Sequence, residues 1–199
     1  AAAALLVMAE PIVRVLYERG AFSVDTTQSV SAALAVFGLG LPAFVMIKAF
    51  TPGFFAREDT RTPMIFAGIS VTVNVALALT LFPLIAEAGI AAAEATAGWV
   101  NATLLLTTLI RRGHWRLDRS LLTRIPRLVL AAAIMAAFVW FAAGWLAPWL
   151  AHDSPLPMQA AALAALILGA MVIYFTVAFG TGGADLDMIR RNLRRDRGG

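Results

Sequence analysis

Long apolar runs alternate with short polar interruptions along this chain. A helix that crosses the hydrocarbon core of a bilayer needs roughly 20 mostly apolar residues. Five stretches of that length are predicted to span a membrane, at residues 28–50, 64–85, 89–111, 127–147 and 157–179. A sixth, shorter run at residues 1–8 has neither the basic region nor the cleavage site of a signal peptide. We therefore expect the chain to begin inside a spanning helix of a longer protein.

Composition supports a membrane protein. Hydrophobic residues make up 60% of the 199 residues and mean hydropathy is +0.80, against an apolar share of about 45–50% in soluble domains. We therefore predict an all-α, polytopic transmembrane helix bundle. The sequence has no cysteine, and it has no HExxH motif, phosphate-binding glycine loop or nucleophile elbow. Its two histidines fall in loops on opposite sides of the membrane, so we expect neither an enzyme nor a transition-metal site.

Positive charge sets the expected orientation. If the spans alternate, the connections at 51–63 and 112–126 and the tail after 180 lie on one side, and they and the adjoining helix ends hold most of the 16 basic residues. The positive-inside rule makes that side, and the C-terminus, cytoplasmic. The arginines flank spanning helices without interleaved aromatic residues, which favours contact with anionic phospholipid over nucleic acid.

One lysine stands inside an apolar run. Lys48 is the only ionisable side chain between Val30 and Phe50, and a cation at the bilayer centre costs on the order of 2.5–3.5 kcal/mol. Two interpretations remain open from the residues alone. The lysine extends to the cytoplasmic interface, or it faces an internal cavity where it meets a phosphate or carboxylate of a substrate.

A carboxylate poses the same question in a later helix. Glu94 lies about one turn into its helix, on a strip of alanines, with no lysine or arginine near it in sequence. It is either an interfacial carboxylate favoured by the helix dipole or a site for a cation or proton. Asn74, deep in the preceding helix, is the expected partner, because an amide oxygen and a carboxylate suit a hard cation.

Glycine and proline mark predicted bending points. In transporter helices such residues often accompany a change in helix direction. The apolar run that contains Lys48 is predicted to break at its Pro-Gly pair into a charged turn, and Pro83 is predicted to end the following helix. The hinge candidates are Gly38, Gly40, Pro42, Pro52 and Gly53.

The same segments resemble a known family. The stretch Glu18-Arg-Gly-Ala-Phe22, then Gly40-Leu-Pro42, then Lys48 with the block from Pro52 to Pro63, is similar to the MurJ (MviN) flippases of the multidrug/oligosaccharidyl-lipid/polysaccharide exporter superfamily. Gly89-Ile90 with Trp99-Val100-Asn101 fits the same family. The resemblance covers essentially the whole chain.

The resemblance implies an architecture. Family members have fourteen transmembrane helices in two rocking lobes, so it implies the C-terminal lobe, from the end of helix 9 through helices 10–14, with the N-terminal lobe as a missing partner. It further implies that helices 13 and 14 form an apolar groove for a lipid tail. The expected divisions are core helices at 1–111, a cytoplasmic basic loop at 112–126, the two additional helices at 127–180 and a cytoplasmic basic tail at 181–199.

A cation site also follows from the resemblance. Some relatives bind sodium, and the register places Asn74 and Glu94 where side-chain ligands are expected and Ile90 where a backbone carbonyl is expected. Ala78 and Glu94 replace an aspartate and a threonine of those relatives, so a carboxylate moved to the neighbouring helix would conserve the charge. No cofactor is expected other than Na⁺ or H⁺ as the coupling ion.

The implied function is movement of the undecaprenyl-linked peptidoglycan precursor, lipid II, from the cytoplasmic to the periplasmic leaflet of a bacterial inner membrane. The chain would do this by alternating access as part of a longer protein. Two alternatives remain, a drug or metabolite cation antiporter of the same superfamily and a non-transporting membrane scaffold.

Overall fold

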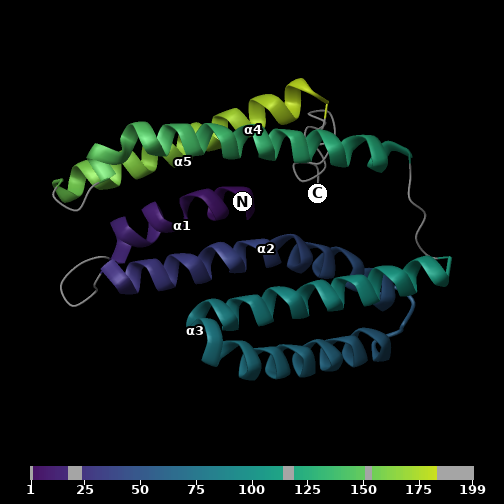
Figure 1. The fold of residues 1–199 in the computed structure, drawn as a ribbon. Coiled ribbons are helices and arrows are strands. Elements are labelled where there is room, and N and C mark those ends of the chain that lie inside the picture. Colours follow the sequence, from purple (N-terminus) through teal and green to yellow (C-terminus); the bar gives the residue numbers. More distant parts are fainter. Residues whose placement is uncertain (1, 18–23, 114–118, 151–153, 183–199) are drawn as a thin grey trace, which may run out of the picture.

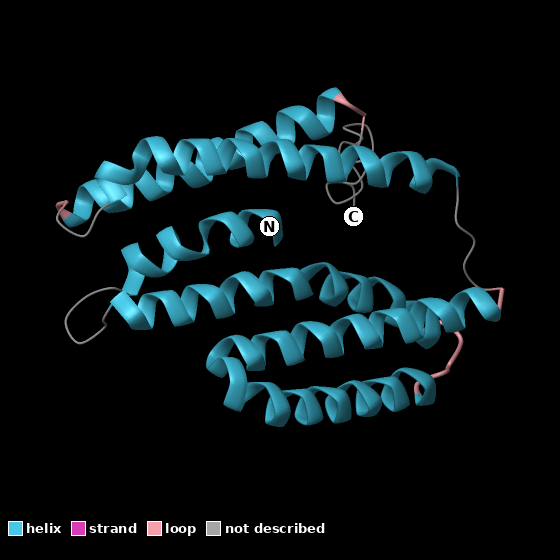
Figure 2. Ribbon diagram, in the orientation of Figure 1, coloured by secondary structure: helices cyan, strands magenta, loops and turns pink. Residues whose placement is uncertain are grey.

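All secondary structure in the described part of the chain is α-helical (Figure 2). A computed structural model describes residues 2–17, 24–113, 119–150 and 154–182. The all-α prediction is confirmed. The helices are α1 (Ala2–Tyr17), α2 (Val24–Phe55), α3 (Arg61–Arg111), α4 (Arg119–Leu150) and α5 (Leu156–Gly180).

The helices lie in layers (Figure 1). The pair α4 and α5 packs together, α1 lies between that pair and α2, and α2 packs along α3. Helix α3 folds back on itself, so its second arm lies between α2 and its first arm. The first core cluster joins α1 to α4 and α5 through residues such as Met8, Val139 and Leu166, and the second joins α2 to α3 through Phe54 and Leu105.

The reversal in α3 separates two predicted spans. Ile85 has φ −136° and ψ 21°, and Ala86 has φ 47° and ψ −127°, so neither residue is helical. The reversal comes two residues after Pro83, where the sequence placed the helix end. The arms on either side match the predicted stretches 64–85 and 89–111. Gly89 allows the arms to close, because a Cβ there would lie 2.7 Å from the backbone carbonyl of Leu81.

Helix α2 runs through its Pro-Gly pair, so the predicted break at Pro52 and Gly53 is wrong. The helix ends at Phe55, where Glu58, at φ 58°, donates its N–H to the Phe55 carbonyl and Asp59 donates to the Phe54 carbonyl. This is a Schellman closure with glutamate in the position that glycine usually takes. Pro52 lacks the N–H that would bond the Lys48 carbonyl, and the helix nevertheless continues for three residues beyond it.

The later helix bounds also differ from those predicted. Helix α4 begins at Arg119, inside the range expected to be the loop 112–126, and it runs through Pro126. Helix α1 continues through Pro11 to Tyr17. The predicted basic tail at 181–199 lies outside the described residues from residue 183 on.

Helix ends gather at two sides of the bundle (Figure 1). One side, which we call the basic end, holds the end of α2, both ends of α3, the start of α4 and the end of α5. The reversal of α3, the end of α1, the start of α2, the end of α4 and the start of α5 lie at the other. This grouping matches the alternation predicted from charge. Described arginines of the basic end are Arg57, Arg61, Arg111, Arg112, Arg124 and Arg127.

Among the described residues, four helices, α2 to α5, are long and apolar enough to cross a membrane. Many large apolar side chains on them are exposed, including Leu79 at 72% and Trp145 at 75%. Such surfaces are stable in hydrocarbon, where helices satisfy their own backbone hydrogen bonds. The chain is a multi-pass membrane protein.

Candidate functional site

The second arm of α3 is a thin central helix. Most of its buried residues are small, among them Ala91, Ala93, Ala95 and Gly98, and small residues let helix backbones approach closely in membranes. A Cβ on Gly40 of α2 would lie 3.0 Å from the Cα of Ala95, and one on Gly98 would lie 2.7 Å from the Phe44 ring. These contacts fix how α2 lies against the central arm.

Polar side chains of α3 mostly bond their own helix. Thr72, Thr96 and Thr103 each donate to the carbonyl four residues earlier. Two side chains instead cross between the arms. Ser70 donates to the Ala97 carbonyl at 2.8 Å, and Asn74 contacts Glu94 as described next. The side-chain hydrogen bonds between the two arms of α3 are therefore those of Ser70 and Asn74.

Asn74 and Glu94 are brought together, as the sequence predicted. The Asn74 Nδ2 donates to Glu94 Oε2 across the two arms of α3. With Ile90 they line a cavity of about 470 Å³ between α2 and α3, which we call the acidic cavity. The binding of a cation to these three residues stays a prediction. The other residues lining the acidic cavity are Val30, Ala33, Leu34, Phe37, Glu87 and Ala91.

Glu87 is a site residue that the sequence reading missed. It lines the acidic cavity seven residues before Glu94, and residues seven apart lie on one face of a helix. That spacing was a usable signal. It was overlooked because Glu87 lies in the short connection that Pro83 and Gly89 were expected to form.

Lys48 and Glu94 line a second space together. This charged groove of about 500 Å³ is otherwise walled by Phe37, Leu41, Phe44, Val45 and Ile47. The Cα–Cβ bond of a helical residue tilts toward the helix N-terminus. The side chain of Lys48 thus starts away from the nearer end of α2, but Lys48 is exposed as well as lining the groove, so both interpretations stay open. Its binding of a substrate stays a prediction.

The hinge candidates are packed rather than free. Gly38 faces α1, where a Cβ would lie 3.2 Å from the Cβ of Leu5, and Gly40 faces the central arm. Pro42 lies inside α2 and its side chain is exposed. Pro52 and Gly53 lie in the last turns of α2. Whether any of these residues acts as a hinge stays a prediction.

A polar cluster closes the basic end. Arg112 donates to Asp59 Oδ2 at 2.5 Å and to Thr62 Oγ1 at 3.2 Å, and its guanidinium lies 5.9 Å from the centre of the Phe54 ring. Asp59 also accepts the Thr62 N–H at 3.0 Å, which caps the start of α3. These four residues form the basic-end cluster. It ties the end of α2 to both ends of α3.

The bond from Arg112, followed by those from Thr62, lowers the pKa of Asp59 from 3.8 to about 2. A lowered pKa means that the folded state favours the carboxylate, so this stabilisation is complete above pH 3.8 and is lost as the pH falls through about 2. Asp59→Asn should lower the melting temperature in detergent at pH 7, and the difference from the parent should shrink between pH 4 and pH 2. Glu58→Gln, at the exposed neighbouring position, is the control. A difference that is the same at pH 7 and pH 2 would contradict the assignment.

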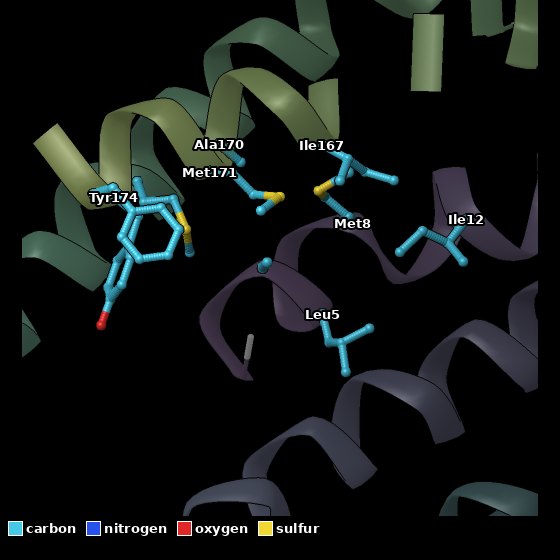
Figure 3. A pocket seen from close by; sticks show the side chains of 10 residues that line it. Leu5, Met8, Ile12, Ile167, Ala170, Met171 and Tyr174 are labelled. Atoms are coloured by element: carbon cyan, nitrogen blue, oxygen red, sulfur yellow. The ribbon is translucent and has the colours of Figure 1, made fainter. Parts of the chain in front are cut away.

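An apolar cavity of about 510 Å³ lies where α1 meets α4 and α5. Figure 3 shows Met8 of α1 and Met171 of α5 extending into the space between their helices. Flexible methionine side chains adapt to irregular ligands. The cavity lies beside the α4–α5 pair, where the family resemblance implies a groove for a lipid tail, and α1 forms one of its walls; the binding of a tail there stays a prediction. The full lining of the cavity is Ala4, Leu5, Met8, Ile12, Met135, Ile167, Ala170, Met171, Tyr174 and Phe175.

Comparison with known proteins gives consistent results. The family model described as "Lipid II flippase MurJ" matches residues 1–159. The chain is 67% identical over 195 residues to a "Probable lipid II flippase MurJ" of Rhizobium meliloti, covering 98% of the chain and 36% of that protein. It is 51% identical to the protein so described in Rhizobium tropici, covering 99% and 37%. A "Lipid II flippase MurJ" of Burkholderia cenocepacia is 34% identical over 143 residues, covering 71% and 28%. The chain spans little more than a third of the length of the two more similar relatives.

Proposed function

The chain belongs to the MurJ family of lipid II flippases, and on that basis we propose that it takes part in moving a lipid-linked peptidoglycan precursor across a bacterial inner membrane. It would act by alternating access, together with a further lobe in the part of the longer relatives that this chain does not cover. The observation that carries the proposal is the charged groove. There a lone lysine of a spanning helix opens onto a space otherwise walled by apolar side chains and one carboxylate.

Lys48 is the proposed contact for the diphosphate of the substrate. A lysine ammonium binds phosphate as a point charge with three N–H donors. Coulomb attraction that is about 1 kcal/mol at 4 Å in water rises severalfold where the surroundings reduce the effective dielectric constant. The aromatic and aliphatic walls of the groove reduce screening in this way. Substrate binding at Lys48 is therefore stronger inside the groove than at the membrane surface.

The apolar cavity supports the same proposal. A polyprenyl chain needs an apolar channel, and the cavity between α1, α4 and α5 offers about 510 Å³ with almost no polar atoms on its walls. Burial of each CH₂ group contributes about 0.8 kcal/mol in such surroundings. The tail would lie on the α4–α5 side of α1 and the headgroup on the α2–α3 side.

The proposed orientation places the basic end in the cytoplasm. The described arginines of that end would contact anionic phospholipid, each contributing about 1 kcal/mol near the surface. Lys48 then lies in the cytoplasmic half of α2, and the acidic cavity lies toward the periplasm. The precursor would meet the lysine first, on the side where it is made.

Repression of the gene in its host tests the proposed function. We expect the precursor headgroup to become inaccessible to a membrane-impermeant reagent added outside, because the precursor stays in the inner leaflet. Restored expression should return it to the outer leaflet. Unchanged accessibility, together with loss of efflux of a small organic cation, would favour the antiporter alternative. Unchanged accessibility and efflux, with loss of a captured protein partner, would favour the scaffold.

Glu94 is the proposed site for the coupling ion, Na⁺ or H⁺, with Asn74 and the Ile90 carbonyl. Glu94→Gln should make transport independent of the ion gradient while the protein still reaches the membrane, because the amide keeps the contact with Asn74 but carries no charge. Glu87→Gln is the matched control, since it removes one carboxylate from the same cavity without touching that contact. Transport by Glu94→Gln with the ion dependence of the parent would rule out the assignment.

A further inference from the structure

Trp99 makes a hydrogen bond to the weakest turn of α2. Its indole Nε1 donates to the Leu39 carbonyl at 3.0 Å. Three residues later Pro42 lacks the N–H that would bond the Gly38 carbonyl, and its ring presses on that carbonyl. Neighbouring helices commonly supply hydrogen bonds where a proline weakens a membrane helix. Trp99 donates from the central arm of α3 to the carbonyl of Leu39, next to the Gly38 carbonyl that Pro42 leaves without its helix partner.

The part of α2 beyond Pro42 is held firmly against α3. Phe50 and Phe54 are buried with Leu105 and Leu109. The basic-end cluster adds the contacts of Arg112 with Asp59 and with the Phe54 ring. Movement of this half relative to α3 would break an apolar core and an ion pair together. The half that carries Lys48 is therefore fixed to α3.

The part of α2 before Pro42 forms one wall of the acidic cavity. Val30, Ala33, Leu34 and Phe37 face Glu94 across that space. Its close contacts with α3 are made near the proline turn, at Leu39 and Gly40. No counterpart of the Phe54 core joins this half to α3 among the described clusters, and its other packing is against α1, where a Cβ on Gly38 would lie 3.2 Å from the Cβ of Leu5, so α1 would have to yield with it. A bend at Pro42 would move this wall and leave Lys48 in place.

We propose that Trp99 is a positioning residue that latches the first half of α2, residues 24–41, over Glu94, with Pro42 as the pivot. While the indole holds the Leu39 carbonyl, the acidic cavity keeps its present width. When the bond breaks, the wall swings outward and the end of the cavity opposite the basic end widens. The contribution of the latch to transport rests on the proposed function, but the movement itself does not.

The size of the movement follows from helix geometry. Val30 lies twelve residues before Pro42, about 18 Å along the axis at about 1.5 Å per residue. A change in kink of about 20°, the scale of sharp proline kinks, would displace Val30 by about 6 Å. That distance is enough to expose the Asn74–Glu94 contact to water and ions. Lys48, beyond the pivot, would not move relative to α3.

Pulsed EPR distances between spin labels test the latch in the whole protein. The chain has no cysteine, so labels can be placed at introduced cysteines. The reporter pair is Ala32→Cys and Leu84→Cys, across the mobile wall, and the reference pair is Ala49→Cys and Ile110→Cys, across the fixed half. All four positions are exposed.

Trp99→Phe should lengthen the reporter distance by several ångström in a larger share of molecules and leave the reference distance unchanged. The indole is 43% exposed, so phenylalanine removes the N–H and little packing. Trp140→Phe, at an exposed position of α4, is the matched control and should change neither distance. In a Pro42→Ala background, which restores the helix bond to Gly38, Trp99→Phe should have no effect on the reporter pair.

Three results would overturn the latch. They are an unchanged reporter distance in Trp99→Phe, equal broadening of both pairs, and the same broadening with or without Pro42. The distances are measured without any transport assay, so they stand even if the repression experiment fails. A lengthened reporter distance in a protein that does not move the lipid precursor would support the latch and reject the proposed function.

Discussion

Alanine at Gly89 should destabilise the protein by about 2 kcal/mol or more, the upper part of the range for overpacked cores. The added Cβ would lie 2.7 Å from both the carbonyl carbon and oxygen of Leu81. Those atoms belong to the backbone of the opposing arm and cannot rotate away, so the two arms of α3 must separate. Separation would also weaken the Asn74–Glu94 contact. Thermal unfolding in detergent measures the loss, and the same spin-label method detects the separation.

Gly68→Ala is the matched control in the same helix. No heavy atom of the described structure lies within 4 Å of a Cβ placed there, and alanine favours a helix over glycine by up to about 1 kcal/mol. It should leave stability unchanged or raise it slightly. Equal stability of the Gly89→Ala and Gly68→Ala proteins would show that the arms do not meet at Gly89 as described.

Lys48→Ala at the chromosomal locus should abolish or strongly impair growth, whereas Lys48→Arg should largely retain it. The proposed role requires a positive charge in the charged groove, and arginine keeps the charge and can contact phosphate with two N–H donors. Alanine leaves only the carboxylate of Glu94 in that space, which repels an anionic headgroup. Growth and the outer-leaflet accessibility of the precursor are measured in the same strains.

Arg61→Ala is the control for loss of charge. It removes one exposed cation from the basic end, outside the charged groove, and should grow normally. Full growth of both Lys48 variants would support the alternative in which the lysine only extends to the interface. Loss of growth in Lys48→Ala with normal protein level and normal precursor accessibility would separate Lys48 from transport.

Helix existence was predictable because it depends on length and hydropathy alone. All five predicted spans are present, as α2, the two arms of α3, α4 and α5. Helix ends were predicted less well because they depend on local backbone bonds. Pro52 and Gly53 looked like a terminus, yet α2 continues to Phe55 and closes on Glu58, a residue with no sequence signature for a left-handed position.

The candidate site was predictable where it depends on one hairpin. Asn74 and Glu94 lie on consecutive spans joined by a short reversal, so their pairing follows from the distance of each residue from the turn. The shared groove of Lys48 and Glu94 was not predictable. It depends on the axial position of α2 along the central arm, which is set by Gly40 against Ala95 and Phe44 against Gly98. Neither close contact has a periodic signal in the sequence.

The alanine surface of the central arm has a mechanical consequence. Alanine side chains form shallow ridges, so a neighbouring helix can slide past them along the axis with little steric resistance. The axial position of α2 on this arm therefore rests on a few contacts: Gly40 against Ala95, Phe44 against Gly98 and the hydrogen bond from Trp99 to the Leu39 carbonyl. Removing one of these contacts would change the free energy of unfolding little but would allow α2 to shift along the axis of the central arm. We therefore expect the proposed transport to be more sensitive to such substitutions than the melting temperature is.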